Sequence, residues 1–422
     1  MTFRRLLARV AATFLLLPAL THCGGGAGTG TIGPPPTPLP TGANVTPIIV
    51  DAGAKAQLVN IPSVSVTICA PGTSNCQTID HILLDTQSTG LRIIASVLSP
   101  SVVLPQVHSA AGDSLFNCLV FANQDYIWGG VNTADVQIAN GQASSLAVQL
   151  ISDHAVNPSV PVTPTDCSQS NLTVPRASLA TVTALGSNGI LGISVFRQDC
   201  GTLCLTSATA GYYYGCPASG CVGATVSRLV DELNNPISQM TGNDRNGVLI
   251  VLPAIEPSGR RTATGALVLG VDTEANNQLG TATVLGLDPA TGNFTTTYKG
   301  QRLTASFMDT GSNGLFFPDS SGSLPVCAAS SGFYCPASAQ ALTASNQGVG
   351  ANNTPTTISF SIVNEESVTT VNGNFAAFDN IGGPSAGPNT FDWGLPFFFG
   401  RKVFMTFEGQ TSSAGAGPFV AY

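Results

Sequence analysis

Charged side chains are scarce in this chain of 422 residues, because Asp, Glu, Lys and Arg together make up only 9% of it. An average soluble domain holds roughly a quarter. This shortage excludes a coiled coil, a long-helix repeat and a charged disordered tail. Gly (46 residues) and Pro (28) are abundant instead, beside a hydrophobic content of 43%. The composition predicts a large, mostly β protein with many turns.

Several kinds of functional site are also missing from the sequence. Beyond residue 22 the only histidines are His81, His108 and His154, which are scattered without metal-ligand spacing, so we expect no metal. GPSAG at residues 383–387 has the form GxSxG, but no histidine follows it, which excludes the usual Ser, acid, His order. Neither a phosphate loop nor a dinucleotide fingerprint occurs, and we expect no cofactor.

The N-terminus is typical of an exported protein. Three arginines precede the apolar run VAATFLLLPAL, which is too short to span a bilayer, and we predict a signal peptide over residues 1–22. The segment LTHC that ends at Cys23 resembles the lipobox of bacterial lipoproteins, although His22 stands where that pattern usually carries Gly, Ala or Ser. The resemblance implies lipidation of Cys23. Ordinary cleavage nearby, with Cys23 unmodified, is the alternative.

The mature chain is predicted to lie in the bacterial cell envelope on a lipid anchor. Residues 23–46 are rich in Gly and Pro, and we predict that they form the lipidated cysteine and a tether after it. No second apolar stretch is long enough to cross a membrane, so the lipid is the only anchor expected. Removal of residues 1–22 leaves 12 basic and 23 acidic residues, a net charge of −11. No basic patch remains for nucleic acid, and we expect a monomer.

The cysteines predict disulfides. The total of 11 is odd, but setting Cys23 aside leaves ten, an even number in an oxidising compartment. Short spacings favour the pairs Cys69 with Cys76 and Cys327 with Cys335. Cys118 and Cys167 remain beside a local quartet, in which the pairing is open: Cys200, Cys204, Cys216 and Cys221. Zinc in the quartet is the weaker alternative, because the CxxxC and CxxxxC spacings differ from a CxxC knuckle.

The chain from about residue 45 onward reads as a succession of short strands separated by Gly, Pro, Asn and Asp. One segment, TVSRLVDELNNP at residues 225–236, has helical spacing of its apolar residues. A single helix in so long a chain supports an all-β class.

An internal duplication is the most informative feature. HILLDTQSTGLRI around Asp85 and SFMDTGSNGLFF around Asp309 align without a gap and lie 224 residues apart. That separation is the scale of two lobes rather than of a solenoid repeat. We place the lobes at residues 47–240 and 241–422, with the boundary in a turn-rich stretch.

Two copies of Asp-Thr-x-Ser predict an acid and a base in one site. A strand that ends in a tight turn presents its Asp carboxylate at the tip, and approximate two-fold symmetry would bring two such carboxylates together. Both cannot ionise easily, so one keeps a proton. Such a pair can activate a water and protonate a carbonyl or a leaving nitrogen. The alternative, two unrelated helix caps or Asx-turns, leaves the duplication unexplained.

These loops resemble those of the pepsin-like aspartic peptidases. Accessory segments of that family are similar to stretches here in the same order, as follows: YIWGGVNTADVQIAN (126–140), NGILGIS (188–194), TGALVLGVD (264–272) and WGLPFFFGRKVFMTFEG (393–409). The resemblance implies a bilobal all-β fold, a polypeptide substrate or ligand, and an Asp85–Asp309 dyad. It further implies that Thr86 and Thr310 lock the loops, and that Ser88 and Ser312 donate to the carboxylates. The chain also resembles an uncharacterised family of bacterial envelope lipoproteins.

One position departs from the peptidase pattern. The third residue of each loop is Gly in active relatives, and here Gly311 obeys while Gln87 does not. The Gln87 side chain would either block water or substrate, or tune the site as an extra polar contact. A catalytically silent protein that binds peptide or another extended polymer is therefore the alternative to an endopeptidase. The flap tyrosine of the family has no clear counterpart: Tyr126 and Trp128 are candidates, with packed core aromatics as the alternative.

Overall fold

The computed structural model describes residues 38–422 except 172, 210 and 351–353. The predicted signal peptide, Cys23 and most of the predicted tether lie outside the described residues. The first strand already begins at Val45, inside the range predicted as tether. Within the described part of the chain, no helix combines the length and the apolar composition needed to cross a bilayer.

Strands are the main regular structure of the described chain, and helices are few and short, which confirms the all-β prediction. The first half contains β1 (Val45–Asp51), β2 (Ile61–Cys69), β3 (Cys76–Asp85), β4 (Thr89–Ile94), β5 (Leu115–Val120), β6 (Tyr126–Ile138), β7 (Gly141–Ile151), β8 (Gln169–Ser170), β9 (Val174–Pro175), β10 (Gly189–Ile193), β11 (Tyr213–Gly215) and β12 (Val222–Gly223). The second half contains β13 (Gly247–Val251), β14 (Ala263–Leu269), β15 (Val284–Gly286), β16 (Phe294–Tyr298), β17 (Gln301–Asp309), β18 (Leu315–Phe316), β19 (Gln340–Gln347), β20 (Thr356–Ile362), β21 (Gly382–Gly383), β22 (Asp392–Gly394), β23 (Lys402–Thr406), β24 (Thr411–Ser412), β25 (Gly415–Ala416) and β26 (Phe419–Ala421).

The helices of the described chain are short. The α-helices are α1 (Thr165–Ser168), α2 (Val182–Leu185), α3 (Thr202–Thr206) and α4 (Glu365–Val371). The 3₁₀ turns are η1 (Ala95–Val97), η2 (Leu229–Asp231), η3 (Ile237–Gln239) and η4 (Leu395–Phe398).

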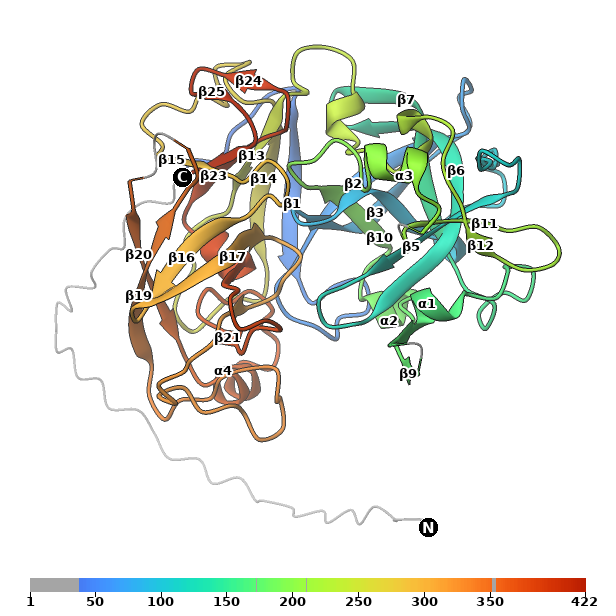
Figure 1. The fold of residues 1–422 in the computed structure, drawn as a ribbon. Helices are drawn as coiled ribbons and strands as arrows, with labels where there is room; N and C mark the ends of the chain where they lie inside the picture. Colours follow the sequence, from blue (N-terminus) through green and yellow to red (C-terminus); the bar gives the residue numbers. More distant parts are fainter. Residues whose placement is uncertain (1–37, 172, 210, 351–353) are drawn as a thin grey trace, which may run out of the picture. The chain divides into compact units, whose positions relative to one another are not determined.

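Two large sheets organise the described strands (Figure 1). A 15-stranded sheet runs in the order β12-β11-β5-β6-β7-β4-β10-β3-β2-β1-β14-β13-β23-β26-β15. A seven-stranded sheet has the order β20-β19-β16-β17-β22-β18-β21. The larger sheet continues from β1 into β14 and β13, so its hydrogen bonding joins the two halves. The predicted lobe boundary at 240 and 241 therefore stays a prediction.

The duplication read from the sequence extends to the strand pairings. In the first half β10 lies between β3 and β4, parallel to β3 and antiparallel to β4, and β4 pairs in parallel with β7. In the second half β22 lies between β17 and β18 with the same two directions, and β18 pairs in parallel with β21. Each set thus threads a later strand between the two arms of an aspartate loop, as the pepsin-like resemblance implies.

Glycine is required where the threaded strands pass the loops. Gly192 of β10 pairs with Asp85, and Gly394 of β22 pairs with Asp309. A Cβ on Gly192 would lie 2.8 Å from backbone atoms of Ser88, and one on Gly394 would lie 2.6 Å from the Ser312 carbonyl oxygen. Any larger residue would push the loop away from its strand.

The helix predicted over residues 225–236 is wrong. Only η2 forms there, Val230 is 55% exposed, and polar Asn235 is fully buried. The Asn235 side chain accepts hydrogen bonds from the backbone N–H groups of Ile237 and Ser238, and it donates to the carbonyl of Ser194. Side-chain bonds of this kind satisfy the backbone locally and compete with a helix.

Five disulfides form among the ten described cysteines, as predicted. The pairs Cys69–Cys76 and Cys327–Cys335 are confirmed, and Cys118 pairs with Cys167. The quartet divides into two pairs with short spacing, Cys200–Cys204 and Cys216–Cys221.

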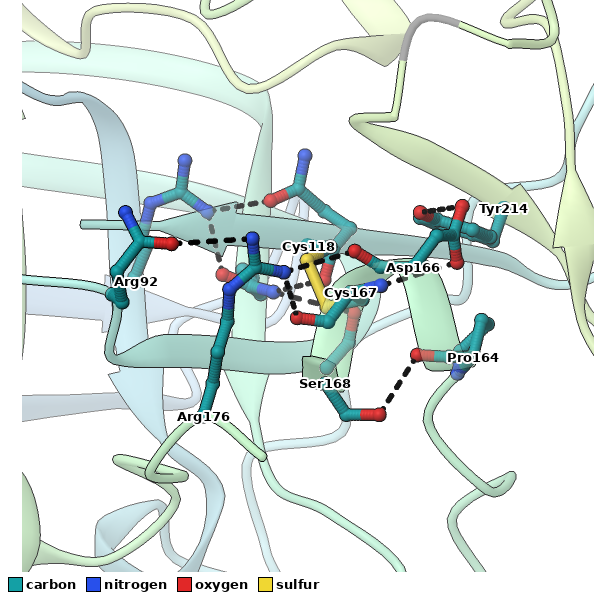
Figure 2. Close-up of a disulfide and its surroundings, with 12 residues drawn as sticks. Arg92, Cys118, Pro164, Asp166, Cys167, Ser168, Arg176 and Tyr214 are labelled. Carbon is teal, nitrogen blue, oxygen red and sulfur yellow. Dashed lines mark hydrogen bonds between the residues drawn. A yellow bond between two sulfur atoms is a disulfide. The ribbon is translucent and has the colours of Figure 1, made fainter. Parts of the chain in front are cut away.

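The Cys118–Cys167 disulfide ties β5 to α1 (Figure 2). Around it, the Arg176 guanidinium donates to the carbonyls of Asp166 and Cys167 at 2.9 Å each, and the Tyr214 hydroxyl donates to the Asp166 carboxylate at 2.9 Å. Both sulfur-bearing residues are buried. The disulfide therefore joins the β5–β6 hairpin to the segment that follows β7.

Replacing both Cys118 and Cys167 with Ala should destabilise the protein more than removing a short-range disulfide. The chain closed by Cys118–Cys167 spans 49 residues and that closed by Cys216–Cys221 spans 5. Loop-closure entropy alone corresponds to about 4 and about 2 kcal/mol respectively. Urea unfolding of the two double-alanine variants measures the difference. Equal losses would show that loop length does not govern the contribution of these bridges.

Candidate active site

The Asp85 carboxylate lies at the end of β3 and is held by its own loop. Asp85 is 6% exposed. Its Oδ1 accepts from the backbone N–H of Gln87 at 2.8 Å and of Ser88 at 3.2 Å, while its Oδ2 accepts from Ser88 Oγ at 2.5 Å. The buried residues Ile82 and Leu84 on β3 anchor the strand in the core behind the loop. These two buried side chains thus fix the strand end that carries the carboxylate.

The Asp309 carboxylate repeats this arrangement at the end of β17. Oδ1 accepts from the backbone N–H of Gly311 at 2.8 Å, and Oδ2 accepts from Ser312 Oγ at 2.8 Å. Equivalent backbone and serine hydroxyl donors therefore hold both carboxylates, while the backbone N–H of Ser312 donates to the Asp309 carbonyl rather than to its carboxylate. Ser88 and Ser312 occupy the positions in which the sequence predicted supporting donors.

Thr86 and Thr310 join the two loops through buried hydrogen bonds. Thr310 Oγ1 donates to the carbonyl of Leu84 at 2.6 Å, and Thr86 Oγ1 donates to the carbonyl of Met308 at 3.0 Å. The backbone N–H of Thr310 also donates to Thr86 Oγ1 at 3.0 Å. Both threonines are fully buried, and each accepting carbonyl immediately precedes an aspartate. This cross-bonding sets how far apart the two aspartates lie.

The two carboxylates border the same small region beside Gly311. A Cβ built on Gly311 would lie 3.1 Å from Oδ1 of Asp309 and 3.1 Å from Oδ1 of Asp85. Glycine at this position therefore leaves the region between the carboxylates open. The resemblance to the pepsin-like loops implies Gly there for this reason.

Burial and the neighbouring charge of Asp85 both raise the pKa of Asp309 above its usual range. The donors from Ser312 and Gly311 act in the opposite direction but are the smaller effect. A carboxyl that stays protonated beside a second carboxyl is the state expected when two such groups share a site.

The Gln87 side chain bonds across to the other loop. Its backbone N–H keeps the bond to Asp85, and its side-chain Nε2 donates to the carbonyl of Met308 at 3.0 Å. That carbonyl also accepts from Thr86. Gln87 is otherwise exposed. The departure from glycine thus adds one more polar contact between the loops, in a position next to the carboxylates.

Tyr126 and Trp128, the two flap candidates, are core aromatics in this structure. Tyr126 is 7% exposed and Trp128 is fully buried. Trp128 packs against Phe116 and Tyr214 with ring centroids 5.2 and 5.3 Å apart. The packing agrees with the alternative that the sequence left open, and a flap role for either residue stays a prediction.

Sequence reasoning missed a third carboxyl in this region. Asp392, the first residue of β22, accepts or donates a 2.6 Å hydrogen bond at Oδ2 with Ser312 Oγ. It is 8% exposed, and its Oδ1 has no hydrogen-bond partner. The one available signal was a single acid within the apolar stretch FDWGLPFFF.

A buried cation near the first loop was also missed, although it lies within the duplicated segment. Arg92 is 1% exposed and donates to Asn117 Oδ1 at 2.7 Å and Gln149 Oε1 at 2.6 Å (Figure 2). Burial lowers the pKa of Arg92, while the negative charges of Asp199 and Asp85 oppose that shift. A buried positive charge therefore acts on the Asp85 side of the site, and the second loop carries Phe316 at the equivalent position.

These features define a class: a mostly β protein with an internal duplication, in which two equivalent loops present two carboxylates to one region. Over residues 40–422 the chain matches the family described as "Protein of unknown function (DUF3443)", and it belongs to that family. No curated protein matches it.

Among solved structures, the chain is similar to the crystal structure of an aspartic proteinase from Irpex lacteus. The sequence identity is 14%, the alignment covers 89% of this chain and 96% of that chain, and the TM-score is 0.47. So distant a likeness carries no activity over to this chain.

Because the pKa of Asp309 is raised, the folded protein should lose stability as the pH rises. Its folded-state pKa lies above its unfolded value, so the folded protein binds an extra proton between the two. The resulting stabilisation is complete below the unfolded pKa, near pH 4, and is lost as pH rises through the folded pKa. The asparagine in Asp309→Asn does not ionise, so this variant should not show the loss of stability. We expect its Tm relative to wild type to rise by roughly 3 °C or more between pH 4 and pH 8.

Asp288→Asn is the matched control for this measurement. Hydrogen bonds from Ala290 and Thr291 lower the pKa of Asp288, so its effect on stability changes only below about pH 4. Its Tm relative to wild type should stay level from pH 5 to pH 8. A flat difference for Asp309→Asn as well would contradict the raised pKa.

Proposed function

We propose that this protein is an exported, lipid-anchored aspartic endopeptidase, in which Asp85 and Asp309 activate a water to hydrolyse peptide bonds. The observation that carries the proposal is the equivalence of the two loops. Each aspartate accepts from its own backbone and serine donors, and the two carboxylates border one region beside Gly311. A structural role for two unrelated turns would not need this correspondence.

In the proposed reaction, one carboxyl is protonated and the other is charged. The charged carboxylate takes a proton from a water, and the oxygen of that water bonds to the substrate carbonyl carbon. The protonated carboxyl gives its proton to the carbonyl oxygen, forming a neutral diol. As the C–N bond breaks, the first carboxyl gives its proton to the amide nitrogen and the second, now charged, takes a proton from a diol hydroxyl, which leaves an amine and a carboxylic acid. The pair thus ends the cycle as it began, with one carboxyl charged and the other protonated.

The supporting residues keep the two carboxylates in position during these transfers. Ser88 and Ser312 donate to the outer carboxylate oxygens, and the buried hydroxyls of Thr86 and Thr310 keep the loops from separating under charge repulsion. A fixed pair of this kind needs little rearrangement as charge moves between the carboxylates.

The proposed location in the bacterial envelope rests on several lines. The signal-like N-terminus and the lipobox-like segment ending at Cys23 support export and lipidation. Five disulfides fit an oxidising compartment. A lipid on Cys23 with the Gly- and Pro-rich segment after it would hold the folded domain near a membrane surface, with access to polypeptide substrates.

One observation favours a second function, the binding of peptide without cleavage. Gln87 stands where the equivalent loop has Gly311, and its side chain lies at the site with its amide bonded to the carbonyl of Met308. A side chain in that position reduces the room for a water or for an extended substrate. The backbone donor to Asp85 is retained, so the carboxylate itself is still supported.

Cleavage of an unfolded protein between about pH 3 and 6, the range in which paired carboxyls hold one proton, tests the first function. We expect the full-length protein to release new peptides in this range, Asp309→Asn to release none, and the control Asp288→Asn to match wild type. Mass spectrometry of the products measures all three. No cleavage, with substrate still bound by wild type, would support the binding function. Cleavage that survives Asp309→Asn would exclude the dyad.

Gln87→Gly should raise the cleavage rate, because it restores the open space that Gly311 provides on the other loop. We expect an increase of about fivefold in kcat/KM, equivalent to about 1 kcal/mol of barrier. Gln87→Asn, which keeps an amide but shortens the side chain, is the matched control and should give a smaller increase. If Gln87→Gly has the wild-type rate, the side chain does not obstruct the site.

A further inference from the structure

Asp392 is a third acidic residue at the paired carboxylates, and the mechanism proposed above does not use it. It begins β22, where it pairs with Phe307 of β17 and Phe316 of β18, and its chain neighbours Phe391 and Trp393 are fully buried. The other ionisable groups whose charges act on it are Asp309, at the end of β17, and Asp85, at the end of β3.

The hydrogen bonds of Ser312 decide the protonation state of Asp392. Ser312 Oγ lies 2.8 Å from Oδ2 of Asp309 and 2.6 Å from Oδ2 of Asp392. A serine hydroxyl has one proton to donate and can also accept. Both short contacts are hydrogen bonds only if one of the two carboxyls is protonated and donates to the serine oxygen.

Of the two, Asp392 is the carboxyl suited to donate through Oδ2. Its Oδ1 is buried without a partner, so an ionised Asp392 would leave a charged oxygen unsolvated. Burial and the negative charges of Asp309 and Asp85 raise the pKa of Asp392 well above its usual range. Asp309, in contrast, accepts at both oxygens, from Gly311 and from Ser312, and its own proton is directed at Asp85, the side-chain hydrogen bond that helps to raise its pKa.

The third carboxyl is present on one side of the site only. Asp392 lies two residues before Gly394, the glycine that pairs with Asp309, and the residue two before the equivalent Gly192 is Ile190. Ile190 is fully buried and apolar. Ser88, the counterpart of Ser312, bonds to Asp85 Oδ2 without such a neighbour. The two-fold symmetry of the dyad is thus also broken at this position.

We infer that Asp392 is a positioning residue: as a neutral acid it donates to Ser312, so that the only proton of the Ser312 hydroxyl is directed at Oδ2 of Asp309. The sequence of donors runs from Asp392 to Ser312 to Asp309. If Asp392 loses its proton, the hydroxyl turns towards the new carboxylate, and Asp309 loses the donor at its outer oxygen. The kinetic consequence, an alkaline limit on cleavage, rests on the proposed peptidase function.

Carbon-13 NMR of aspartate carboxyl groups in the full-length protein tests the protonation state without any substrate. At pH 7 we expect two aspartate carboxyl resonances at the chemical shift of a neutral acid: one is lost in Asp309→Asn, as the raised pKa of that residue predicts, and the other, lost in Asp392→Asn, belongs to Asp392. Ser312→Ala should change its titration, while the matched variant Ser88→Ala should not. If the Asp392 resonance titrates near pH 4, or responds equally to the two serine variants, the inference is overturned.

The pH profile of cleavage separates positioning from a merely structural role. Asn at position 392 keeps an N–H donor for Ser312 but cannot ionise, so Asp392→Asn should retain the acid-side rate and extend cleavage upwards by about one pH unit. An Asp392→Asn variant that loses rate equally at every pH would contradict the inference. If wild type cleaves nothing while the NMR resonance behaves as expected, the proposed peptidase function fails and the assignment of Asp392 stands.

Discussion

The cross-bonding of Thr86 and Thr310 is the interaction on which the rest of the site depends. Each hydroxyl donates to the carbonyl that immediately precedes the opposite aspartate, across more than 220 residues of chain. These bonds are buried, and a hydroxyl or carbonyl left unpaired there would cost about 1–3 kcal/mol. They hold together two strand ends whose carboxylates would otherwise repel one another. The position of each carboxylate, the open region beside Gly311 and the shifted pKa of Asp309 all follow from this constraint.

The loops are equivalent in their backbone and unequal in their side chains. The donors from the third-position backbone N–H and from the serine hydroxyl match at the two aspartates, as do the strands threaded behind them. The differences are Gln87 against Gly311, Asp392 against Ile190, and a buried cation, Arg92, on the first side only. A symmetric scaffold supplies two carboxyls with similar surroundings, and it is these substitutions that make one differ from the other. Positions at which a local rule is broken are often those that carry function.

The sequence predicted the fold and the central residues because these leave local and repeated signals. Short apolar runs between turn residues indicate strands, and two Asp-Thr-x-Ser loops in register indicate one site made twice. Disulfides between cysteines seven or eight residues apart were predicted for the same reason: proximity in sequence limits the choice of partner. The pairing within the quartet could be assigned only from the structure, because several pairings with short spacing were possible.

What the sequence could not predict depends on contacts between distant residues. The helix expected at residues 225–236 fails because the Asn235 side chain bonds to the Ser194 carbonyl and to the backbone N–H groups of Ile237 and Ser238. A periodicity of apolar residues does not reveal such bonds. The Gln87 amide reaches Met308 only because the loops meet. Asp392 looks like one stray acid in an apolar strand until β22 is placed between the two arms of the second loop.

The central claim is that Asp85 and Asp309 ionise as a coupled pair. Comparing the pKa of Asp309 in wild type with that in Asp85→Asn tests this claim most directly. Titration of the Asp309 carboxyl resonance, identified by its loss in Asp309→Asn, measures both values. The negative charge of Asp85 is one of the causes that raise the pKa of Asp309, so the account predicts a clear fall in Asp85→Asn. An unchanged pKa would contradict it, because the two carboxyls would then be separate groups.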